Sequence, residues 1–203
     1  MSRSPIVGVL ALQGDVREHL RALNACGADV RPVRRPADLD GLDGIVLPGG
    51  ESTTIDKLSR IFELREPLIT ALQGGLPAYG SCAGMILLAK NVLDGTKDQQ
   101  TFGALDITVR RNAFGRQVES FETDVDLDGI GGGPVHAVFI RAPWVETIDD
   151  GVEILGDVVP PGLDESKIIA VRHESVLATS FHPEVTDDLR IHRYFIELVR
   201  AAH

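Results

Sequence analysis

Short apolar runs that end in glycine or proline alternate with helix-forming segments through the first ninety residues, and this alternation strongly constrains the fold. The run from Ile6 to Leu12 has the continuous apolar character of a strand buried on both faces. Asp15 is a candidate N-cap for a helix from Val16 to Ala25, which Gly27 ends. Further strands are predicted over residues 30–33, 43–47 and 77–80, and further helices from Ser52 or Thr53 to Leu58 and over residues 64–72 and 83–89. The alternation predicts a parallel sheet covered by helices on both faces.

After about residue 100 the pattern changes to strands in series. They are predicted over residues 106–111, 118–125, 135–140, 152–158, 168–171 and 177–181. Short consecutive strands usually pair antiparallel, so we expect a mixed sheet or an added ribbon. Thr186 and the two acids after it mark the start of a closing helix. The fold class expected is α/β: a three-layer, open, mixed but mostly parallel sheet with helices on both faces and antiparallel strands in the second half. With no repeat and no linker, residues 1–203 are expected to form a single domain.

Composition excludes several classes of function. Thirty acidic against twenty basic residues give a net charge of −10, which argues against nucleic-acid and anionic-membrane partners. The uncharged stretch 67–89 is long enough to span a bilayer, but its glycines and Pro77 make it a poor lipid-exposed helix. Two cysteines provide neither a disulfide framework nor a cysteine-rich zinc site. No secretion signal is visible at the start, so a cytoplasmic protein is expected.

The sharpest local motif is Gly80-Ser-Cys-Ala-Gly84, between a predicted strand and a predicted helix. Gly-x-Cys-x-Gly at such a junction has the form of a nucleophile elbow, in which the glycines permit a tight turn that presents Cys82. The helix after the turn would direct its N–H groups at the sulfur and favour a thiolate. The alternative is a buried cysteine packed as a small hydrophobe, and the motif alone does not decide between them. Cys26, at a helix end, is expected to be structural.

A thiol nucleophile needs a base and a group that orients that base. His182-Pro-Glu184 closes a predicted strand, and in an extended chain both side chains would point to the same side. Pro183 disfavours a helical conformation at His182. Taken alone, the motif fits a strand-end turn, whereas together with the elbow it predicts a catalytic pair. Among the remaining histidines, His19, His192 and His203 are expected to be on the surface, and His136 and His173 stay open as candidates.

The loop Leu47-Pro-Gly-Gly-Glu-Ser-Thr53 comes after a buried strand. Paired glycines let backbone N–H groups approach a ligand oxygen, but the loop has no Gly-Lys-Ser/Thr, which disfavours nucleotide binding. An oxyanion hole or an amide-binding loop fits better, and an ordinary turn before a capped helix is the competing interpretation.

These motifs together resemble the class I, triad-type glutamine amidotransferases, whose core is flavodoxin-like. More narrowly, the chain resembles the glutaminase subunits of pyridoxal 5′-phosphate synthase. The resemblance rests on five blocks: Leu12-Gln-Gly-Asp-Val-Arg-Glu-His19, Gly49-Gly-Glu-Ser-Thr-Thr54, Arg111-Asn-Ala-Phe-Gly-Arg-Gln117, Phe139-Ile-Arg-Ala-Pro143 and Ser180-Phe-His-Pro-Glu184. The departures are small: Ser81 stands where Thr is also familiar, and the loop from Gly129 to Gly133 is enlarged.

The resemblance implies hydrolysis of L-glutamine to glutamate and ammonia, with the ammonia passed to a separate pyridoxal 5′-phosphate synthase subunit. It implies Cys82 as nucleophile, His182 as base and Glu184 as the orienting acid. The family's glutamine-binding positions correspond to Gly50, Glu51, Ser52, Arg111, Ile140 and Arg141, and its oxyanion donors to the backbone N–H groups of Gly50 and Ala83. It implies no metal and no cofactor. It leaves open whether Arg111 or Arg141 binds the α-carboxylate.

Three other functions are weighed against this one. The elbow could serve another thiol reaction, such as that of a peptidase or a redox-sensing hydrolase. The glutaminase could supply a different synthase, or the chain could be a non-catalytic binding subunit. Because ammonia released without a receiver would be wasted, weak activity alone and stimulation by the synthase subunit are expected. The segment from Gln13 to His19 is the candidate contact region.

Overall fold

The computed structural model describes residues 3–111 and 120–202 of the chain. The strands are β1 (Ile6–Leu10), β2 (Asp29–Val33), β3 (Gly44–Leu47), β4 (Ala78–Ser81), β5 (Ala89–Leu93), β6 (Leu105–Arg110), β7 (Ser120–Val125), β8 (Val135–Ile140), β9 (Trp144–Ile148), β10 (Glu153–Val158), β11 (Lys167–His173) and β12 (Val176–Thr179). The helices are α1 (Val16–Ala25), α2 (Ser52–Ile61), α3 (Arg65–Gln73), α4 (Ala83–Leu88) and α5 (Arg190–Ala201), with 3-10 turns at Pro36–Leu39 and Pro183–Val185.

Ten of these strands form one mixed sheet in the order β2-β1-β3-β4-β12-β11-β9-β6-β5, with β10 paired to β11. The pairs from β2 to β12 are parallel, as is β5 with β6, whereas β9 and β11 pair antiparallel with their neighbours. The strands β7 and β8 form a separate antiparallel ribbon. The predicted mixed, mostly parallel sheet is therefore confirmed, and an added ribbon occurs as well.

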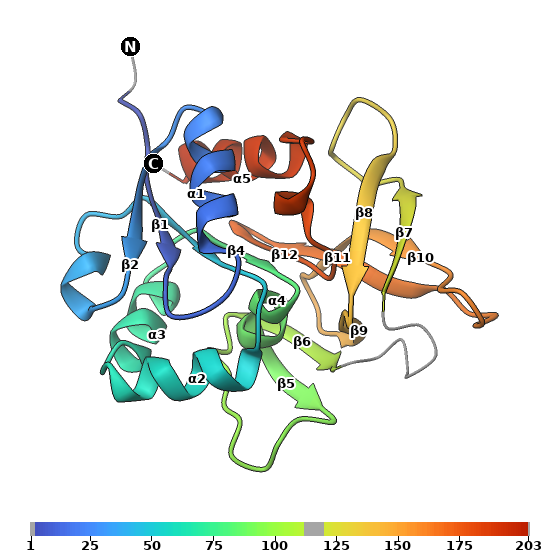
Figure 1. Cartoon of the computed structure of the whole chain (residues 1–203), viewed down its shortest axis with the longest axis horizontal. Helices are drawn as coiled ribbons and strands as arrows, with labels where there is room; N and C mark the ends of the chain where they lie inside the picture. Colours follow the sequence, from blue (N-terminus) through green and yellow to red (C-terminus); the bar gives the residue numbers. More distant parts are fainter. Residues whose placement is uncertain (1–2, 112–119, 203) are drawn as a thin grey trace.

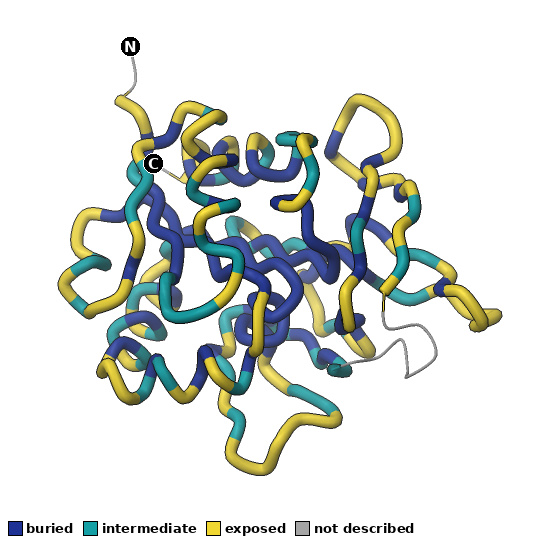
Figure 2. The backbone as a smooth tube through the Cα atoms, viewed as in Figure 1, coloured by how far each residue is buried: buried dark blue, intermediate teal, exposed yellow. Residues whose placement is uncertain are grey.

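Helices cover both faces of the sheet, as predicted (Figure 1). The helices α1 and α5 lie on one face, where Leu23 and Phe195 join a buried apolar cluster. The helices α2, α3 and α4 lie on the other face, where Ile55, Leu68 and Leu87 join a second cluster. The central strands are buried between these layers (Figure 2), which explains why their sequences are continuously apolar rather than alternating.

Several of the sequence-based predictions of strands and helices differ from the structure. The sequence pattern does not predict the strands β5 and β9: β5 carries the exposed Lys90 and Asn91, and β9 has no alternating apolar pattern. The last helix begins at Arg190 rather than at Thr186, because a 3-10 turn and a short loop precede it. Asp15 is the N-cap of α1 by position, but its side chain makes no capping hydrogen bond. Residues 118 and 119 of the predicted strand 118–125 lie outside the described residues.

The uncharged stretch 67–89 divides into most of α3, all of β4 and α4, and the first residue of β5. Among the described residues, no helix has the length and apolar character that a membrane crossing requires.

The register of β4 and β12 determines where the predicted site residues meet. Thr179 pairs with Ser81 in this parallel pair, although the two lie almost a hundred residues apart in the sequence. The residues just beyond each strand, Cys82 after β4 and His182 after β12, therefore emerge at the same edge of the sheet. This is the carboxyl edge, where open α/β sheets bind their ligands.

Candidate active site

A pocket of about 370 Å³ opens at this edge of the sheet. The loops after β1, β3, β4, β8 and β12 all contribute to the pocket or border it. Its lining residues are Gln13, Asp15, Gly50, Glu51, Ser52, Cys82, Ala83, Ile86, Arg111, Ile140, Arg141 and His182. Every predicted substrate-binding and oxyanion residue is in this set, together with Cys82 and His182. The remainder of the block that begins at Arg111 cannot be placed relative to the pocket, because residues 112–119 lie outside the described part of the chain.

Cys82 occupies a tight turn between β4 and α4, as the elbow motif predicts. Its backbone has φ +47° and ψ −101°, a conformation that non-glycine residues rarely adopt. The flanking glycines allow the close packing: a Cβ on Gly84 would lie 2.1 Å from the Leu47 carbonyl oxygen, and one on Gly80 would lie 2.5 Å from the Gly84 carbonyl carbon. The sulfur is nearly buried but borders the pocket, 3.9 Å from the Ile140 carbonyl oxygen.

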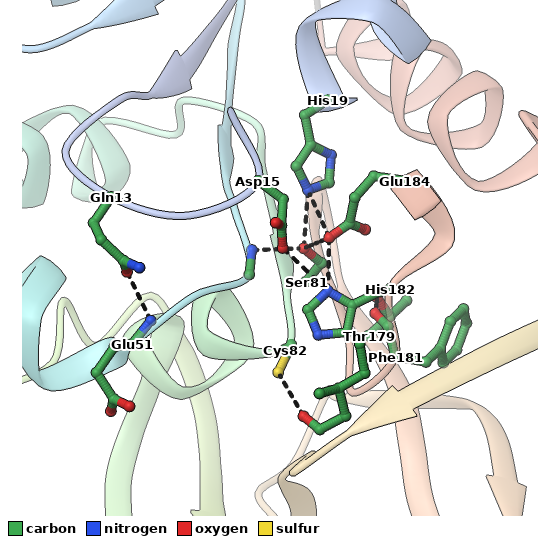
Figure 3. Close-up of polar contacts among 12 residues, drawn as sticks. Gln13, Asp15, His19, Glu51, Ser81, Cys82, Thr179, Phe181, His182 and Glu184 are labelled. Carbon is green, nitrogen blue, oxygen red and sulfur yellow. Dashed lines mark hydrogen bonds and ion pairs between the residues drawn. The ribbon is translucent and has the colours of Figure 1, made fainter. Parts of the chain in front are cut away.

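His182 and Glu184 form a buried pair beside the sulfur (Figure 3). The His182 Nδ1 lies 2.8 Å from Glu184 Oε1 and 3.5 Å from Asp15 Oδ2, while the other edge of the ring faces Cys82. The pairing agrees with the sequence prediction, but the extended backbone predicted for it is wrong. Residues 183–185 form a 3-10 turn, and this turn brings the Glu184 carboxylate back onto the ring.

The electrostatics favour a charged pair. Burial alone would lower the pKa of His182, but hydrogen bonds with Asp15, Cys82 and Glu184 outweigh it and raise that pKa to about 12. Burial alone would raise the pKa of Glu184, but the contacts with His19 and His182 hold it well below its usual range. The imidazole is thus held in its protonated form beside the Cys82 sulfur.

The loop after β3 is anchored by the loop after β1. The Glu51 N–H donates to Gln13 Oε1 at 2.7 Å, and the Asp15 N–H donates to the Gly49 carbonyl oxygen at 3.1 Å. Gly50 has φ +150°, and a Cβ there would lie 2.5 Å from Gln13 Oε1. Only glycine fits this position without a shift, which explains the second glycine of the motif.

A hydrogen-bonded group joins the loop after β3 to Arg111, which follows β6. The Arg111 guanidinium donates to Glu51 Oε1 at 2.8 Å and to Gln99 Oε1 at 2.9 Å. The Gln99 amide in turn donates to Ser52 Oγ at 3.0 Å. Sequence reasoning does not single out Gln99, because it lies in a polar turn segment without a motif. Arg141, just after β8, has φ +43° and borders the pocket, so its backbone is strained at the site.

Two expectations about histidines are wrong. His19 and His192 are completely buried rather than on the surface, and their ring nitrogens lie 3.0 Å apart. His136 lies on the β7–β8 ribbon between Glu122 and Asp124, and His173 ends β11, so neither lines the pocket. His203 lies outside the described residues.

Asp15, His182 and Glu184 each offer a ligand atom, and these atoms lie within 4.8 Å of one another. The same atoms already form the contacts between the imidazole and its two carboxylates, and the raised pKa of His182 keeps on the ring the proton that a metal would have to displace. The group therefore fits an oriented base better than a metal centre.

Comparison with known proteins agrees with this geometry. A sequence profile of the SNO glutamine amidotransferase family matches residues 9–201. The chain belongs to this family. The pyridoxal 5′-phosphate synthase subunit PdxT of Salinispora arenicola (strain CNS-205) is 62% identical over 199 residues, which cover 98% of each chain. The protein of the same name from Nocardia farcinica (strain IFM 10152) is 63% identical over 198 residues, covering 98% of this chain and 87% of that one.

A solved structure has the same fold. A crystal structure described as a glutamine amidotransferase superposes with a TM-score of 0.86 at 47% sequence identity, covering 96% of this chain and 98% of the other. The family resemblance expected from the five sequence blocks is therefore confirmed.

Proposed function

We propose that this chain is the glutaminase subunit of a pyridoxal 5′-phosphate synthase and hydrolyses L-glutamine to L-glutamate and ammonia through Cys82. The observation that carries the proposal is that Cys82 and His182 line one pocket, with Glu184 2.8 Å from the His182 ring, in a chain that belongs to a glutamine amidotransferase family. The PdxT relatives, similar over nearly the whole chain, support the synthase assignment.

In the proposed reaction the Cys82 sulfur attacks the side-chain amide carbon of glutamine. The proton held by His182 passes to the amide nitrogen, the C–N bond breaks, and ammonia leaves a γ-glutamyl thioester. His182 then takes a proton from water, the resulting hydroxide attacks the thioester carbon, and glutamate and the thiol are released. Glu184 keeps the imidazole in line with the sulfur through the 2.8 Å contact.

The pocket wall would hold the rest of the substrate. The backbone N–H groups of Gly50 and Ala83 are proposed to stabilise the oxyanion, and Glu51 to accept from the α-ammonium group. An arginine suits the α-carboxylate, because its planar guanidinium group can donate a hydrogen bond to each of the two carboxylate oxygens. Arg111 and Arg141 both border the pocket, and Ser52 and Ile140 complete the proposed binding surface.

Ammonia is proposed to pass to a synthase subunit, so this chain would act in a hetero-oligomer. The proposed chemistry needs no cofactor or metal: the thiol supplies the nucleophile and the backbone supplies the electrophile. We expect the synthase subunit to stimulate glutamate release.

The direct test is glutamate release from L-glutamine, measured with and without the synthase subunit. We expect Cys82→Ala to abolish release, while Cys26→Ala, at a half-buried thiol away from the pocket, retains it. Full activity of Cys82→Ala would reject the proposal. Turnover of peptides in place of glutamine would instead support the hydrolase alternative.

A further inference from the structure

A buried row of polar side chains extends from α5 to the proposed catalytic acid. The His192 Nε2 lies 3.0 Å from His19 Nδ1, and the His19 Nε2 lies 3.0 Å from Ser81 Oγ. Ser81 Oγ donates to Glu184 Oε1 at 3.4 Å, and His19 Nε2 lies 3.4 Å from the same oxygen. His19, Ser81 and His192 are completely buried. Figure 3 shows His19 reaching from α1 toward the Ser81 hydroxyl and the Glu184 carboxylate.

The hydrogen bonds of Ser81 determine which nitrogen of His19 carries a proton. A hydroxyl donates once and accepts twice. Ser81 Oγ accepts from the Gly49 N–H at 3.1 Å and donates to the ionised Glu184, so its remaining contact, with His19 Nε2, is one in which it accepts. A bare Nε2 would also place its lone pair against the carboxylate. His19 therefore has a proton on Nε2.

Burial determines the arrangement at the far end of the row. If His19 Nδ1 accepts, His192 donates from its Nε2, and the Nδ1 of His192 is then an unprotonated acceptor. This Nδ1 is buried and has no hydrogen-bond partner among the described residues. The opposite arrangement would leave a buried N–H without a partner, which proteins tolerate less readily. Every proton in the row therefore points toward Glu184.

We propose that His19 is a positioning residue of the glutaminase site: its Nε2–H, acting directly and through Ser81, fixes Glu184 Oε1 in line with His182. This inference rests on the proposed function. The same Ser81 oxygen accepts from Gly49, in the loop proposed to bind the oxyanion, so the row also links the two sides of the pocket. His19 does not border the pocket and so would not contact substrate.

Three substitutions separate positioning from packing. Gln places its amide nitrogen close to the Nε2 position, Asn places its own close to Nδ1, and Leu fills the space without a donor. With the synthase subunit present, we expect His19→Gln to keep kcat within about threefold of the wild type. We expect His19→Leu and His19→Asn to lower kcat about tenfold or more with KM changed less than about twofold, because an orienting group acts on the chemical step.

Circular dichroism establishes that each variant is folded at the assay temperature, and if His19→Leu does not fold, the Gln and Asn pair decides. The inference is overturned if His19→Gln loses as much kcat as the folded His19→Asn and His19→Leu variants. It is also overturned if His19→Asn keeps the wild-type kcat, or if the substitutions change KM and leave kcat unchanged. Nitrogen-15 NMR of the wild type is an independent check: the expected tautomer of His19 and His192 is protonated on Nε2, and protonation of His19 on Nδ1 alone would contradict it. An inactive wild type would reject the proposed function instead.

Discussion

Buried ionisable side chains, His192 among them, make the stability of this molecule depend on pH. Burial lowers the pKa of His192 to about 3, against contributions from Glu184 and Asp188 that raise it. A histidine in the unfolded chain has a pKa of about 6.5. Between these values the unfolded state binds a proton that the folded state does not, so acidification favours unfolding.

We predict that His192→Gln makes the protein less sensitive to acid. In the wild type this residue alone would lower the free energy of unfolding by up to about 1.4 kcal/mol for each pH unit below about 6.5. The measurement is the urea midpoint at pH 7 and pH 5 for both proteins. The difference between the two midpoints should be smaller in the variant, and an equal or larger difference would refute the assignment of His192 as a buried neutral ring.

The same two histidines show where sequence reasoning fails at the residue scale. The charged Arg17 and Glu18 before His19 favour a surface position for it, yet His19 is spaced three and four residues from the buried Ala22 and Leu23. His192 stands beside Ile191, three and four residues before the buried Phe195 and Ile196. Helical periodicity therefore identifies both as core residues. Their contact with each other is not predictable in this way, because it joins helices 173 residues apart.

At the scale of elements, the packing of α4 against β3 holds the elbow in place. The Cβ of an alanine at position 84 would lie 2.1 Å from the backbone oxygen of Leu47, which cannot rotate away. We predict that Gly84→Ala lowers the free energy of unfolding by about 1–3 kcal/mol and also lowers kcat, because α4 must move and Cys82 moves with it. Gly131→Ala is the matched control, since nothing lies within 4 Å of the added Cβ. Thermal melting of both variants checks this, and equal melting temperatures would contradict the packing argument.

Elements with a strong sequence pattern are predictable, and those set by their neighbours are not. The strands β1, β3 and β4 are short, almost fully buried runs that end near glycine or at the elbow, and their positions agree with the predictions to within a few residues. The strand β5 carries polar residues at its start and pairs in parallel with β6, a partner that its own sequence does not specify. The turn at residues 183–185 is not predictable from Pro183, which restricts its own φ but not the conformation of the residues after it.

At the scale of the whole molecule, the sheet interleaves the two halves of the chain. The strand β12 lies between β4 and β11, so the site needs both the first eighty-two residues and the last quarter. We propose that the chain unfolds as one domain. Trp144, the only tryptophan, reports on β9 in the second half, whereas far-UV circular dichroism is dominated by helices, most of which lie in the first half.

We predict that urea transitions followed by Trp144 fluorescence and by far-UV circular dichroism coincide. Transitions with separate midpoints would show that the two halves unfold independently.

The general class of the fold and the site motifs are predictable from sequence, because each depends on local patterns. The place of Ile140 and Arg141 at the pocket follows from the family resemblance and not from a local pattern, because it depends on how the β7–β8 ribbon packs.

The most direct test of the central claim is mass spectrometry of the protein quenched in acid during turnover of L-glutamine. The account predicts a γ-glutamyl adduct on the peptide that contains Cys82 and none on the peptide that contains Cys26. Glutamate release without an adduct at Cys82, or unchanged release by Cys82→Ala, would contradict it.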